Sequence, residues 1–405
     1  MRERVVVDGE VRRATVHFDG GAITRIDTAT ADTDFGSLVI LPGLVDSHVH
    51  VNEPGRTEWE GFDSATRAAA AGGTTTIVDM PLNSIPPTVD TEALEAKQSA
   101  AAGKLSVDTA FWGGIIPGSL PNAAELVERG VCGFKAFMVD SGVPEFPPLD
   151  DRELMEAIEQ VGALGVPLLV HAEDPASIVP ATGDATSYAT YEATRPLDAE
   201  ALAIERLARL ATSSRGRVHV LHGSSGRAAA GLAGSDALTG ETCPHYLVFC
   251  AEEVPDRATP YKCAPPIRSA EERELLWEAL FAGSIDMIVS DHSPAPADVK
   301  ETESGDFVRA WGGIGSLQLR LQAIWTAAEP RGAAWEDLSR WLSTAPAELA
   351  GLGDRKGTIG EGWDADFVVF DPDDSVEIRG DDLLHRHPVT PYDGMRLRGS
   401  VVATV

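Results

Sequence analysis

The sequence contains few cysteines and no cysteine motif for metal binding. Only four cysteines occur in 405 residues, at Cys132, Cys243, Cys250 and Cys263, and no two of them stand in a CxxC spacing. This pattern argues against a zinc finger and against a disulfide-stapled secreted domain. It is typical of reduced thiols.

Long hydrophobic runs are also absent. No segment approaches the ~20 apolar residues of a membrane-spanning helix, and the opening stretch MRERVVVDGEVRR has no apolar signal core. With 43% hydrophobic and 24% charged residues, the composition is that of a globular protein with a large core. We therefore expect a cytoplasmic protein that does not associate with membranes.

Lysine is the scarcest charged residue. The chain has 33 Lys and Arg against 63 Asp and Glu, for a net charge of −30. The only lysines are Lys97, Lys104, Lys135, Lys262, Lys300 and Lys356. Such an acid excess repels nucleic acids and anionic membranes, so we expect neither as a partner. A GC-rich genome would favour arginine over lysine without producing the acid excess. We therefore hypothesise a halophilic host, whose salt-rich cytoplasm screens the self-repulsion.

Two kinds of pattern divide the chain. Residues 1–41 and 355–405 contain short β-prone runs separated by turn glycines, which predicts a small β-sandwich-like domain built from both termini. Residues 42–354 alternate apolar runs with helical segments such as ELMEAIEQVGALG and DAEALAIERLARLA, which predicts parallel strands with helical crossovers. No glycine-rich phosphate fingerprint follows an early strand. We therefore predict an α/β fold with a (β/α)8 TIM-like barrel rather than an open dinucleotide-binding sheet.

Polar side chains collect where the predicted strands end. His48 and His50 close the run GLVDSHVH and share one face of that strand, because strand side chains alternate. The other polar residues at strand ends are Asp79, Asn83, His171, His222 and Asp291. Any one of them has an ordinary explanation as a surface histidine, a packed core histidine or a helix cap. Together they predict an active site, because barrel enzymes build theirs at the C-terminal strand ends.

Two residues near these strand ends allow finer predictions. His219 precedes His222 by three residues, so strand alternation assigns His219 to the helix-facing side and His222 to the barrel mouth. Lys135 lies between aromatic residues in GFKAFM. Its head group either reaches solvent past the aromatic rings or is a buried amine with a lowered pKa and a task at the barrel mouth.

These spacings resemble the cyclic amidohydrolases of the amidohydrolase superfamily, and the resemblance covers nearly the whole chain. It implies that His48, His50 and Asp291 hold one divalent metal ion and that His171 and His222 hold a second. A carboxylated Lys135 then bridges the two ions. The ligand set suits zinc first, and also cobalt, manganese or iron. The resemblance further implies a homotetramer.

The implied chemistry is metal-assisted hydrolysis of a cyclic amide. Metal ions activate water and polarise the amide carbonyl. Asp291 is implied to accept a proton from the attacking water and to pass it to the leaving nitrogen.

Within this group, several stretches are most similar to allantoinases, namely HVHVNEPGRTEWEGF, DMPLNSIPPT, ETCPHYL, KCAPPIR and TPYDG. By that resemblance, Asn83, Cys263 and Ser293 contact the ureide ring of allantoin, which is opened to allantoate in purine breakdown. Asn83 in a turn and Cys263 as a small hydrophobe also have purely structural explanations.

Asn52 bears on which ring is opened. It stands where dihydroorotases carry an arginine for the substrate carboxylate, and a neutral amide favours an uncharged ring. Arg56, four residues further on, is an alternative cation if its loop turns inward.

Two alternatives to an allantoinase stay open. One is another cyclic amidohydrolase, either a hydantoinase (dihydropyrimidinase) or a dihydroorotase. The other is a scaffold relative without metal, which the complete set of implied ligands disfavours.

Overall fold

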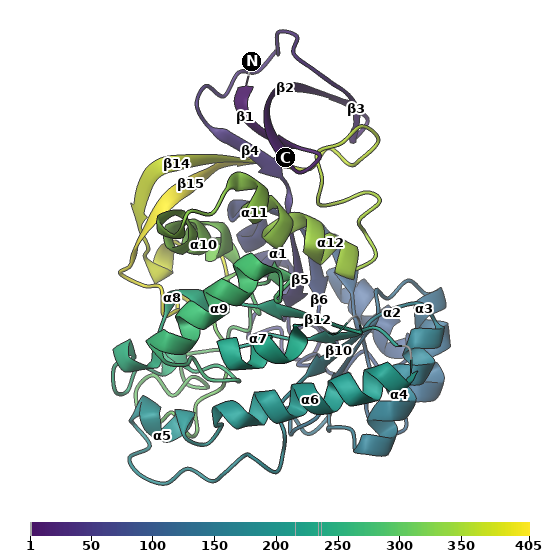
Figure 1. Ribbon diagram of the computed structural model, residues 1–405, viewed down its shortest axis with the longest axis vertical. Coiled ribbons are helices and arrows are strands. Elements are labelled where there is room, and N and C mark those ends of the chain that lie inside the picture. The colour runs from purple at the N-terminus through teal and green to yellow at the C-terminus, as the bar shows by residue number, and fades with distance from the viewer. Residues whose placement is uncertain (1, 215, 234, 236) are drawn as a thin grey trace.

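The computed structural model describes residues 2–214, 216–233, 235 and 237–405. Its larger part is a ring of parallel strands wrapped by helices, with a smaller sheet at one end (Figure 1). The strands of the ring are β5 (Leu44–Val49), β6 (Thr74–Asp79), β7 (Asp108–Phe111), β8 (Gly113–Gly114), β9 (Phe134–Phe137), β10 (Leu168–His171), β11 (Val218–Val220), β12 (Leu238–Thr242) and β13 (Met287–Ile288).

The strands follow one another around the ring in chain order. One sheet runs β5-β6-β7 and the other runs from β8 to β13, and all pairs are parallel. Only Trp112 separates β7 from β8, so the two act as one strand that joins the sheets. On the opposite side, Val49 bridges His292 in parallel, and the His50 amide donates to the His292 carbonyl at 2.8 Å. The ring closes there, and the predicted barrel is confirmed.

Helices follow the strands where the sequence places helical periodicity. They are α1 (Phe62–Ala71), α2 (Thr91–Ala101), α3 (Ala123–Glu128), α4 (Asp151–Ala163), α5 (Tyr188–Glu192), α6 (Leu197–Ser214), α7 (Gly226–Leu232), α8 (Pro244–Val248), α9 (Ala270–Ala282), α10 (Arg320–Ala328), α11 (Trp335–Ser339) and α12 (Ala345–Leu349). The two segments predicted as helices from their sequence periodicity are α4 and α6.

Helix α4 shows why these segments are helical. Asp150 caps it by accepting from the Glu153 amide at 2.8 Å, while Glu153 accepts from the Asp150 amide at 3.1 Å. Leu154, Ile158 and Val161 recur at helical spacing and are buried against the barrel. The capped apolar face therefore fixes this helix on the barrel.

Both chain termini meet in one sheet at the top of Figure 1. Its order is β15-β14-β4-β1-β2-β3. These strands are β1 (Arg2–Val7), β2 (Glu10–Asp19), β3 (Ala22–Asp27), β4 (Val39–Pro42), β14 (Phe367–Glu377) and β15 (Arg396–Thr404). Gly43 alone separates β4 from the first barrel strand, and a Cβ there would lie 2.3 Å from the Thr75 hydroxyl. Only glycine fits at this passage from the terminal sheet into the barrel.

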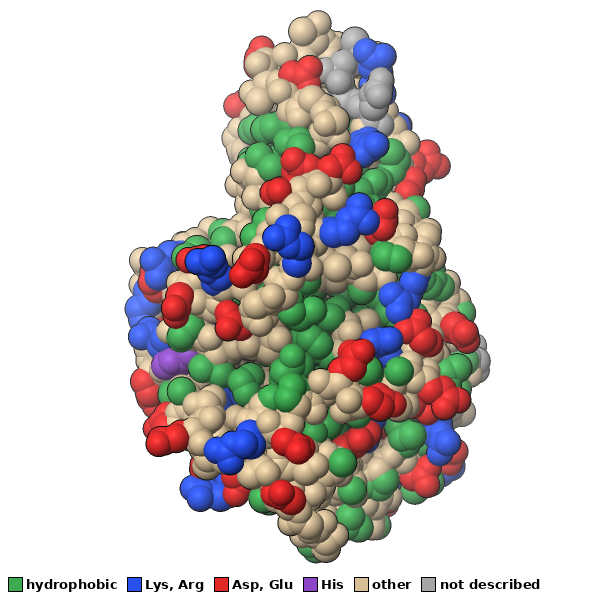
Figure 2. Space-filling view, turned by 90° about the vertical axis from the view of Figure 1, so that its left-hand side faces the viewer, with side chains coloured by type: hydrophobic (Ala, Val, Ile, Leu, Met, Phe, Trp, Pro, Cys, Tyr) green, Lys and Arg blue, Asp and Glu red, His purple; other side chains and the backbone are tan. Residues whose placement is uncertain are grey.

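The scarce lysines lie inside the protein. All lysines except Lys104 have an exposed fraction of 8% or less, whereas the Lys104 side chain is 40% exposed. Surface cations are therefore almost entirely arginines. Acidic side chains are spread over the whole face presented in Figure 2.

Two further predictions concern the state of the cysteines and the presence of membrane-spanning helices. All four cysteines are free thiols, as predicted. Across the described residues, no helix combines the length and apolar character needed to cross a bilayer.

Candidate active site

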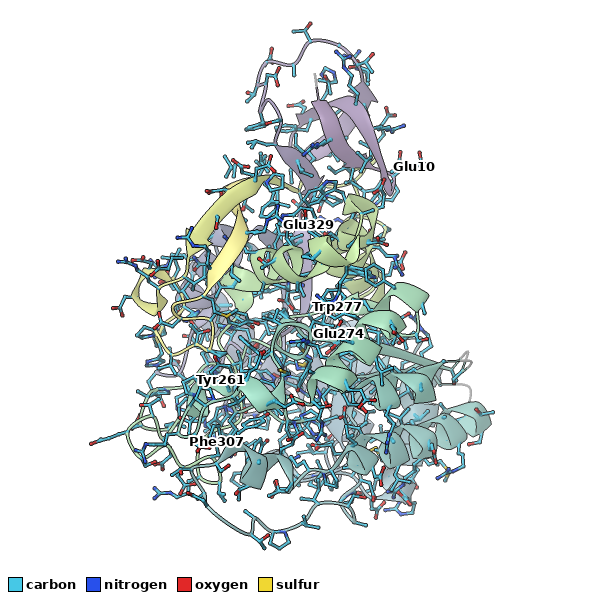
Figure 3. The ribbon with its side chains drawn as sticks, turned by 60° about the vertical axis from the view of Figure 1, so that its left-hand side comes forward. Glu10, Tyr261, Glu274, Trp277, Phe307 and Glu329 are labelled. Atoms are coloured by element: carbon cyan, nitrogen blue, oxygen red, sulfur yellow. The ribbon has the colours of Figure 1, made fainter. Side chains whose placement is uncertain are left out.

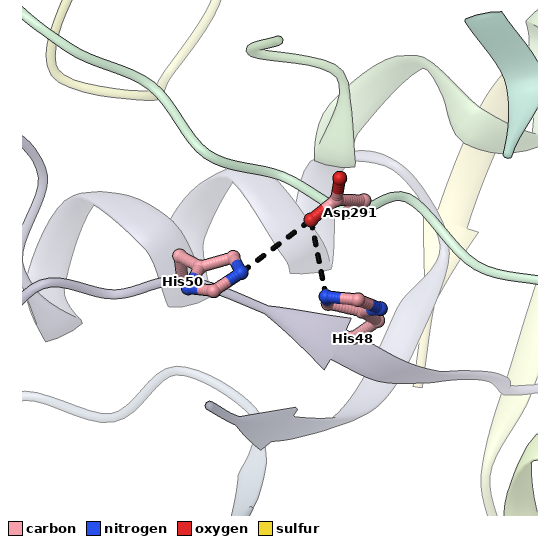
Figure 4. Close-up of side chains that lie close together, drawn as sticks. All are labelled: His48, His50 and Asp291. Carbon is pink, nitrogen blue, oxygen red and sulfur yellow. Dashed lines mark ion pairs between the residues drawn. The ribbon is translucent and has the colours of Figure 1, made fainter. Parts of the chain in front are cut away.

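The paired histidines of the first barrel strand meet the last strand at the barrel mouth. His48 lies on β5, His50 follows it, and Asp291 lies three residues after β13. The Asp291 Oδ1 atom is 3.1 Å from His48 Nε2 and 3.4 Å from His50 Nε2 (Figure 4). Burial alone would raise the pKa of Asp291, but its interactions with His48 and His50 hold that pKa well below the ordinary value. Asp291 is thus an ionised acceptor facing two imidazole nitrogens.

A buried carboxylate behind His48 fixes the orientation of that ring. Glu241 on β12 has one oxygen 2.5 Å from His48 Nδ1 and the other 3.1 Å from His219 Nε2. His48 therefore presents Nε2 to the site. The prediction that His219 faces the helices is wrong, because it shares the Glu241 carboxylate with His48. Strand alternation fails here because His222 has φ +40, so both histidines turn inward.

Lys135 on β9 is buried among these groups. Its side chain is 1% exposed, and Nζ lies 3.3 Å from His48 Nε2 and 5.1 Å from the centre of the Phe137 ring. Burial lowers the pKa of Lys135 to about 8. Of the two interpretations of this lysine, the buried amine is confirmed and the solvent-reaching head group is wrong.

The other two predicted histidines form a pair opposite Lys135. His171 Nδ1, at the end of β10, lies 2.9 Å from His222 Nε2, which follows β11. The far nitrogen of His171, Nε2, lies 2.7 Å from a carboxylate oxygen of Glu173. Burial lowers the pKa of both histidines. Two neutral rings thus direct nitrogens toward one point.

The donor set fits divalent metal ions. His48, His50 and Asp291 each offer a ligand atom within 4.8 Å of the others. Burial also lowers the pKa of His50 to about 3, so its ring is neutral and keeps a free lone pair. His222 Nδ1 is buried without a partner among the described residues. Several neutral imidazoles around a carboxylate and an amine are the ligands that borderline cations prefer.

The backbone at this site departs from strand geometry. Seven non-glycine residues of the described chain have positive φ, and four of them are predicted site residues: Asn52, Asn83, His222 and Asp291. Such conformations are costly and concentrate at functional sites. They turn the side chains out of the strand direction and into the barrel mouth.

A small cavity opens beside the groups that could hold metal ions. Its lining residues are His50, Leu82, Asn83, Lys135, Phe137, Ser141, His171, His222, Ala264, Asp291, Ser293, Trp311 and Gly312. Two predicted substrate residues, Asn83 and Ser293, therefore face it. Asn83 Nδ2 also lies 3.3 Å from His50 Nδ1. Asn52 and Cys263 are buried and are not among its lining residues.

Sequence reasoning missed three functional candidates. Trp311 lines the cavity, packs edge-on against Trp59 with ring centres 4.9 Å apart, and has an indole N–H without a partner in the described chain. Glu173 holds His171, and Glu241 holds His48 and His219. Their signal was a glutamate at the end of an apolar strand, in HAED and in GETCPH. Asp79, by contrast, is held by Lys97 at 2.6 Å and does not face the cavity.

Arg56 does not supply a free cation to the cavity. Its guanidinium pairs with Glu145, donates to the Asn83 carbonyl at 2.9 Å and lies over the Trp59 ring. Its charge is therefore compensated by a carboxylate of a neighbouring loop.

Comparison with known proteins decides the family. Residues 39–405 match the amidohydrolase family. The chain belongs to this family. The allantoinase of Streptomyces avermitilis is 48% identical over 99% of this chain and 92% of its own length. The allantoinase of Saccharomyces cerevisiae is 40% identical over 98% of this chain and 87% of its own length.

Solved structures agree with this amidohydrolase assignment. The L-hydantoinase (dihydropyrimidinase) of Arthrobacter aurescens superimposes with a TM-score of 0.92 at 31% identity, covering 100% of this chain and 94% of that one. The dihydropyrimidinase of Brevibacillus agri has a TM-score of 0.90 at 28% identity, covering 100% and 92%. This amidohydrolase is therefore a hydrolase of cyclic amides with the predicted barrel fold.

Proposed function

We propose that this amidohydrolase is an allantoinase, which hydrolyses the cyclic amide of allantoin to allantoate in ureide catabolism. The observation that carries the proposal is the convergence of six donor residues at the strand ends of a chain 48% identical to an allantoinase. The donors are His48, His50, Lys135, His171, His222 and Asp291. A neutral cyclic ureide as substrate is consistent with this site.

The proposed cofactor is a pair of divalent metal ions. His48, His50 and Asp291 would hold one, His171 and His222 the other. Lys135 would bridge them as its carbamate, because a neutral buried amine reacts with carbon dioxide and the resulting anion neutralises cations. We propose zinc as the native ion, with cobalt, manganese or iron compatible with the same nitrogen and oxygen donors. Bound ions would supply Lewis acidity, which activates water and polarises the scissile carbonyl.

The chain's own residues would move the proton and orient the ring. Asp291 is ionised and lines the cavity. It accepts a proton from water while the water oxygen attacks the amide carbon. The C–N bond then breaks, and Asp291 returns that proton to the leaving ring nitrogen. Asn83 and Ser293 face the cavity with amide and hydroxyl groups that match the N–H and C=O groups of the ureide. Asn52 and Cys263 are buried and do not line the cavity.

Charge distinguishes allantoin from dihydroorotate. Dihydroorotate carries a carboxylate that needs a fixed cation in a buried site. Asn52 is neutral, and Arg56 is already paired with Glu145. The site therefore favours an uncharged ring.

A substrate panel tests this proposal. The metal-reconstituted protein is assayed with allantoin, hydantoin, dihydrouracil and dihydroorotate. Highest kcat/KM with allantoin supports an allantoinase, whereas higher kcat/KM with hydantoin or dihydrouracil makes the protein a hydantoinase. Two bound ions per subunit argue against a scaffold relative, and their absence together with no turnover favours it.

We also propose adaptation to a salt-rich cytoplasm. Its support is the net charge of −30 together with the burial of nearly every lysine, which leaves a surface of carboxylates and arginines. Unfolding midpoints and activity in molar and in millimolar KCl test it, and equal values contradict it. Sedimentation in the same buffers tests the proposed homotetramer.

A further inference from the structure

Two buried ammonium groups lie behind one wall of the cavity. Lys300 is 2% exposed, and its Nζ donates to the carbonyl oxygens of Lys262 at 3.1 Å, Trp311 at 3.0 Å and Gly313 at 2.7 Å. In the described chain, no carboxylate lies within ion-pair distance of this ammonium. Three backbone carbonyls therefore satisfy its three N–H donors.

Lys262 also donates to backbone carbonyls, and its acceptors lie in the segment that carries Lys300. Its Nζ donates to the carbonyls of Val308 at 3.1 Å and Ala310 at 2.5 Å, and it lies 4.8 Å from the centre of the Tyr191 ring. The Tyr191 hydroxyl in turn donates to the Cys263 carbonyl at 2.6 Å. Together, the two lysines donate to five backbone carbonyls, one at Lys262 and four within residues 308–313.

The carbonyls belong to two segments that build this wall, residues 262–264 (the first segment) and residues 294–313 (the second segment). Ala264 lines the cavity from the first segment, and Trp311 and Gly312 line it from the second. The Gly313 amide donates to the Lys262 carbonyl at 2.9 Å, so the segments also bond each other directly. Tyr261 and Phe307, labelled in Figure 3, mark the two segments on the same side of the molecule.

The second segment needs such support. Residues 294–313 contain no helix and no strand, so few of their carbonyls have regular partners. Burying an ammonium is costly unless its donors are satisfied. The chain has only six lysines, and two of them bind these carbonyls. We infer that the fixed position of the second segment serves the function of the protein.

We propose that Lys300, assisted by Lys262, is a positioning residue for substrate recognition, which fixes Trp311–Gly313 against Lys262–Ala264 so that this wall matches the cyclic substrate. The identity of the cyclic substrate in this inference rests on the proposed function. The immobilisation of the wall by the two lysines does not depend on that function.

The test compares Lys300→Met with wild type and with Lys356→Met. Methionine keeps the length of the side chain and removes the ammonium. Lys356 is another buried lysine, but its ammonium binds Asp364 at 3.0 Å and Asp366 at 2.8 Å, near the terminal sheet. Backbone hydrogen exchange of peptides covering residues 300–315, KM, kcat and bound metal are measured for all three proteins.

In Lys300→Met, we expect faster exchange in residues 300–315 and a roughly tenfold rise in KM for allantoin, the effect of weakening one to two hydrogen bonds. The value of kcat should stay within about threefold of wild type and bound metal should be unchanged, because the reacting groups are not touched. Lys356→Met should lose stability without either change. If Lys300→Met does not fold, Lys262→Met tests the same wall.

Unchanged exchange in residues 300–315 of the variant would overturn the proposal. So would faster exchange with an unchanged KM, or an equal fall in kcat with loss of metal. If wild type does not hydrolyse allantoin, the proposed function fails, while the exchange comparison still decides whether the lysines immobilise the wall. KM is then compared on the ring that the protein does hydrolyse.

Discussion

Replacing Glu173 by glutamine tests how the second pair of histidines is held. Glu173 is fully buried, and one of its oxygens accepts from His171 Nε2 at 2.7 Å and from the guanidinium of Arg195. Burial would raise the pKa of Glu173, but the His171 hydrogen bond and the charge of Arg195 hold it below the ordinary value. The ionised carboxylate thus keeps His171 Nε2 protonated and leaves Nδ1 free toward His222.

Glutamine keeps an acceptor oxygen but removes the negative charge. Its carbonyl oxygen can replace the carboxylate oxygen that accepts from His171 and Arg195. Its NH2 group then replaces the other oxygen, which has no partner among the described residues, so a buried donor is left without an acceptor. Loss of the partner carboxylate behind a metal-ligating histidine costs 10–100-fold in metal affinity in typical sites, and we expect a similar loss here, about 2 kcal/mol. Since Arg195 also loses its anionic partner and is 19% exposed, stability should fall by about 2 kcal/mol.

The assay is metal content after dialysis against a graded chelator series, together with activity as a function of added zinc. We expect Glu173→Gln to lose one ion per subunit at a lower chelator strength than wild type, and excess zinc to restore most of kcat. Glu192→Gln is the matched control, because Glu192 lies near the Arg268 charge and, among the described residues, is not a hydrogen-bond partner of His171 or His222. Two ions held with wild-type affinity in Glu173→Gln would refute this account of the His171 orientation.

Four further predictions concern the site and the pH dependence of stability. Lys135→Ala should abolish activity and the second metal site, with partial rescue by short carboxylic acids. Full activity with two ions per subunit contradicts the dinuclear arrangement. Asp291→Asn should lose kcat by roughly a thousandfold while much of the metal and substrate binding survives, and a loss of only a few-fold shows that it is no proton shuttle. Wild type should prefer allantoin over dihydroorotate by at least ~100-fold in kcat/KM, the ~3 kcal/mol of one buried unpaired charge, and comparable values refute the assignment. Burial lowers the pKa of His385 from 6.5 to about 4. Between these pH values the unfolded chain binds a proton at His385 that the folded chain does not bind. The free energy of unfolding should therefore fall as the pH drops from 6.5 to about 4. This group contributes up to about 3 kcal/mol of that loss, and urea unfolding of His385→Gln should show a shallower decline than wild type.

Much of the fold was predictable from the spacing of apolar residues along the sequence. Helical periodicity alternating with short apolar runs predicts parallel strands with crossovers, and parallel strands bring their C-terminal ends to one face. The sequence therefore predicts His48, His50 and His171 at one mouth of the barrel, where the structure has them. The prediction holds because His48 lies on β5, His50 directly follows β5, and His171 ends β10.

Alternation failed where the backbone left the strand. His219 and His222 are three apart and should face opposite sides, yet both turn inward because His222 has φ +40. No propensity argument predicts a left-handed histidine. Likewise, Asp79 ends β6, but Lys97 from α2 binds it at 2.6 Å, a contact that sequence spacing does not encode.

The lysines show what separates a catalytic assignment from a structural one. Scarcity and an apolar neighbourhood single out Lys135 in the sequence, yet Lys97 and Lys300 are buried just as fully in the structure. What differs is the partner that each ammonium has. Lys97 binds the carboxylate of Asp79, and Lys300 binds three carbonyls, so each is satisfied as a cation. Among the described residues, no carboxylate or carbonyl lies within hydrogen-bond distance of Lys135 Nζ, which has an imidazole nitrogen at 3.3 Å and an aromatic ring centre at 5.1 Å. Burial lowers its pKa to about 8, although the charges of Asp291 and Glu241 act on it at longer range. An amine that is buried without an anion or carbonyl partner is poorly stabilised as an ammonium, which is the condition under which it is free to become a carbamate and ligate metal.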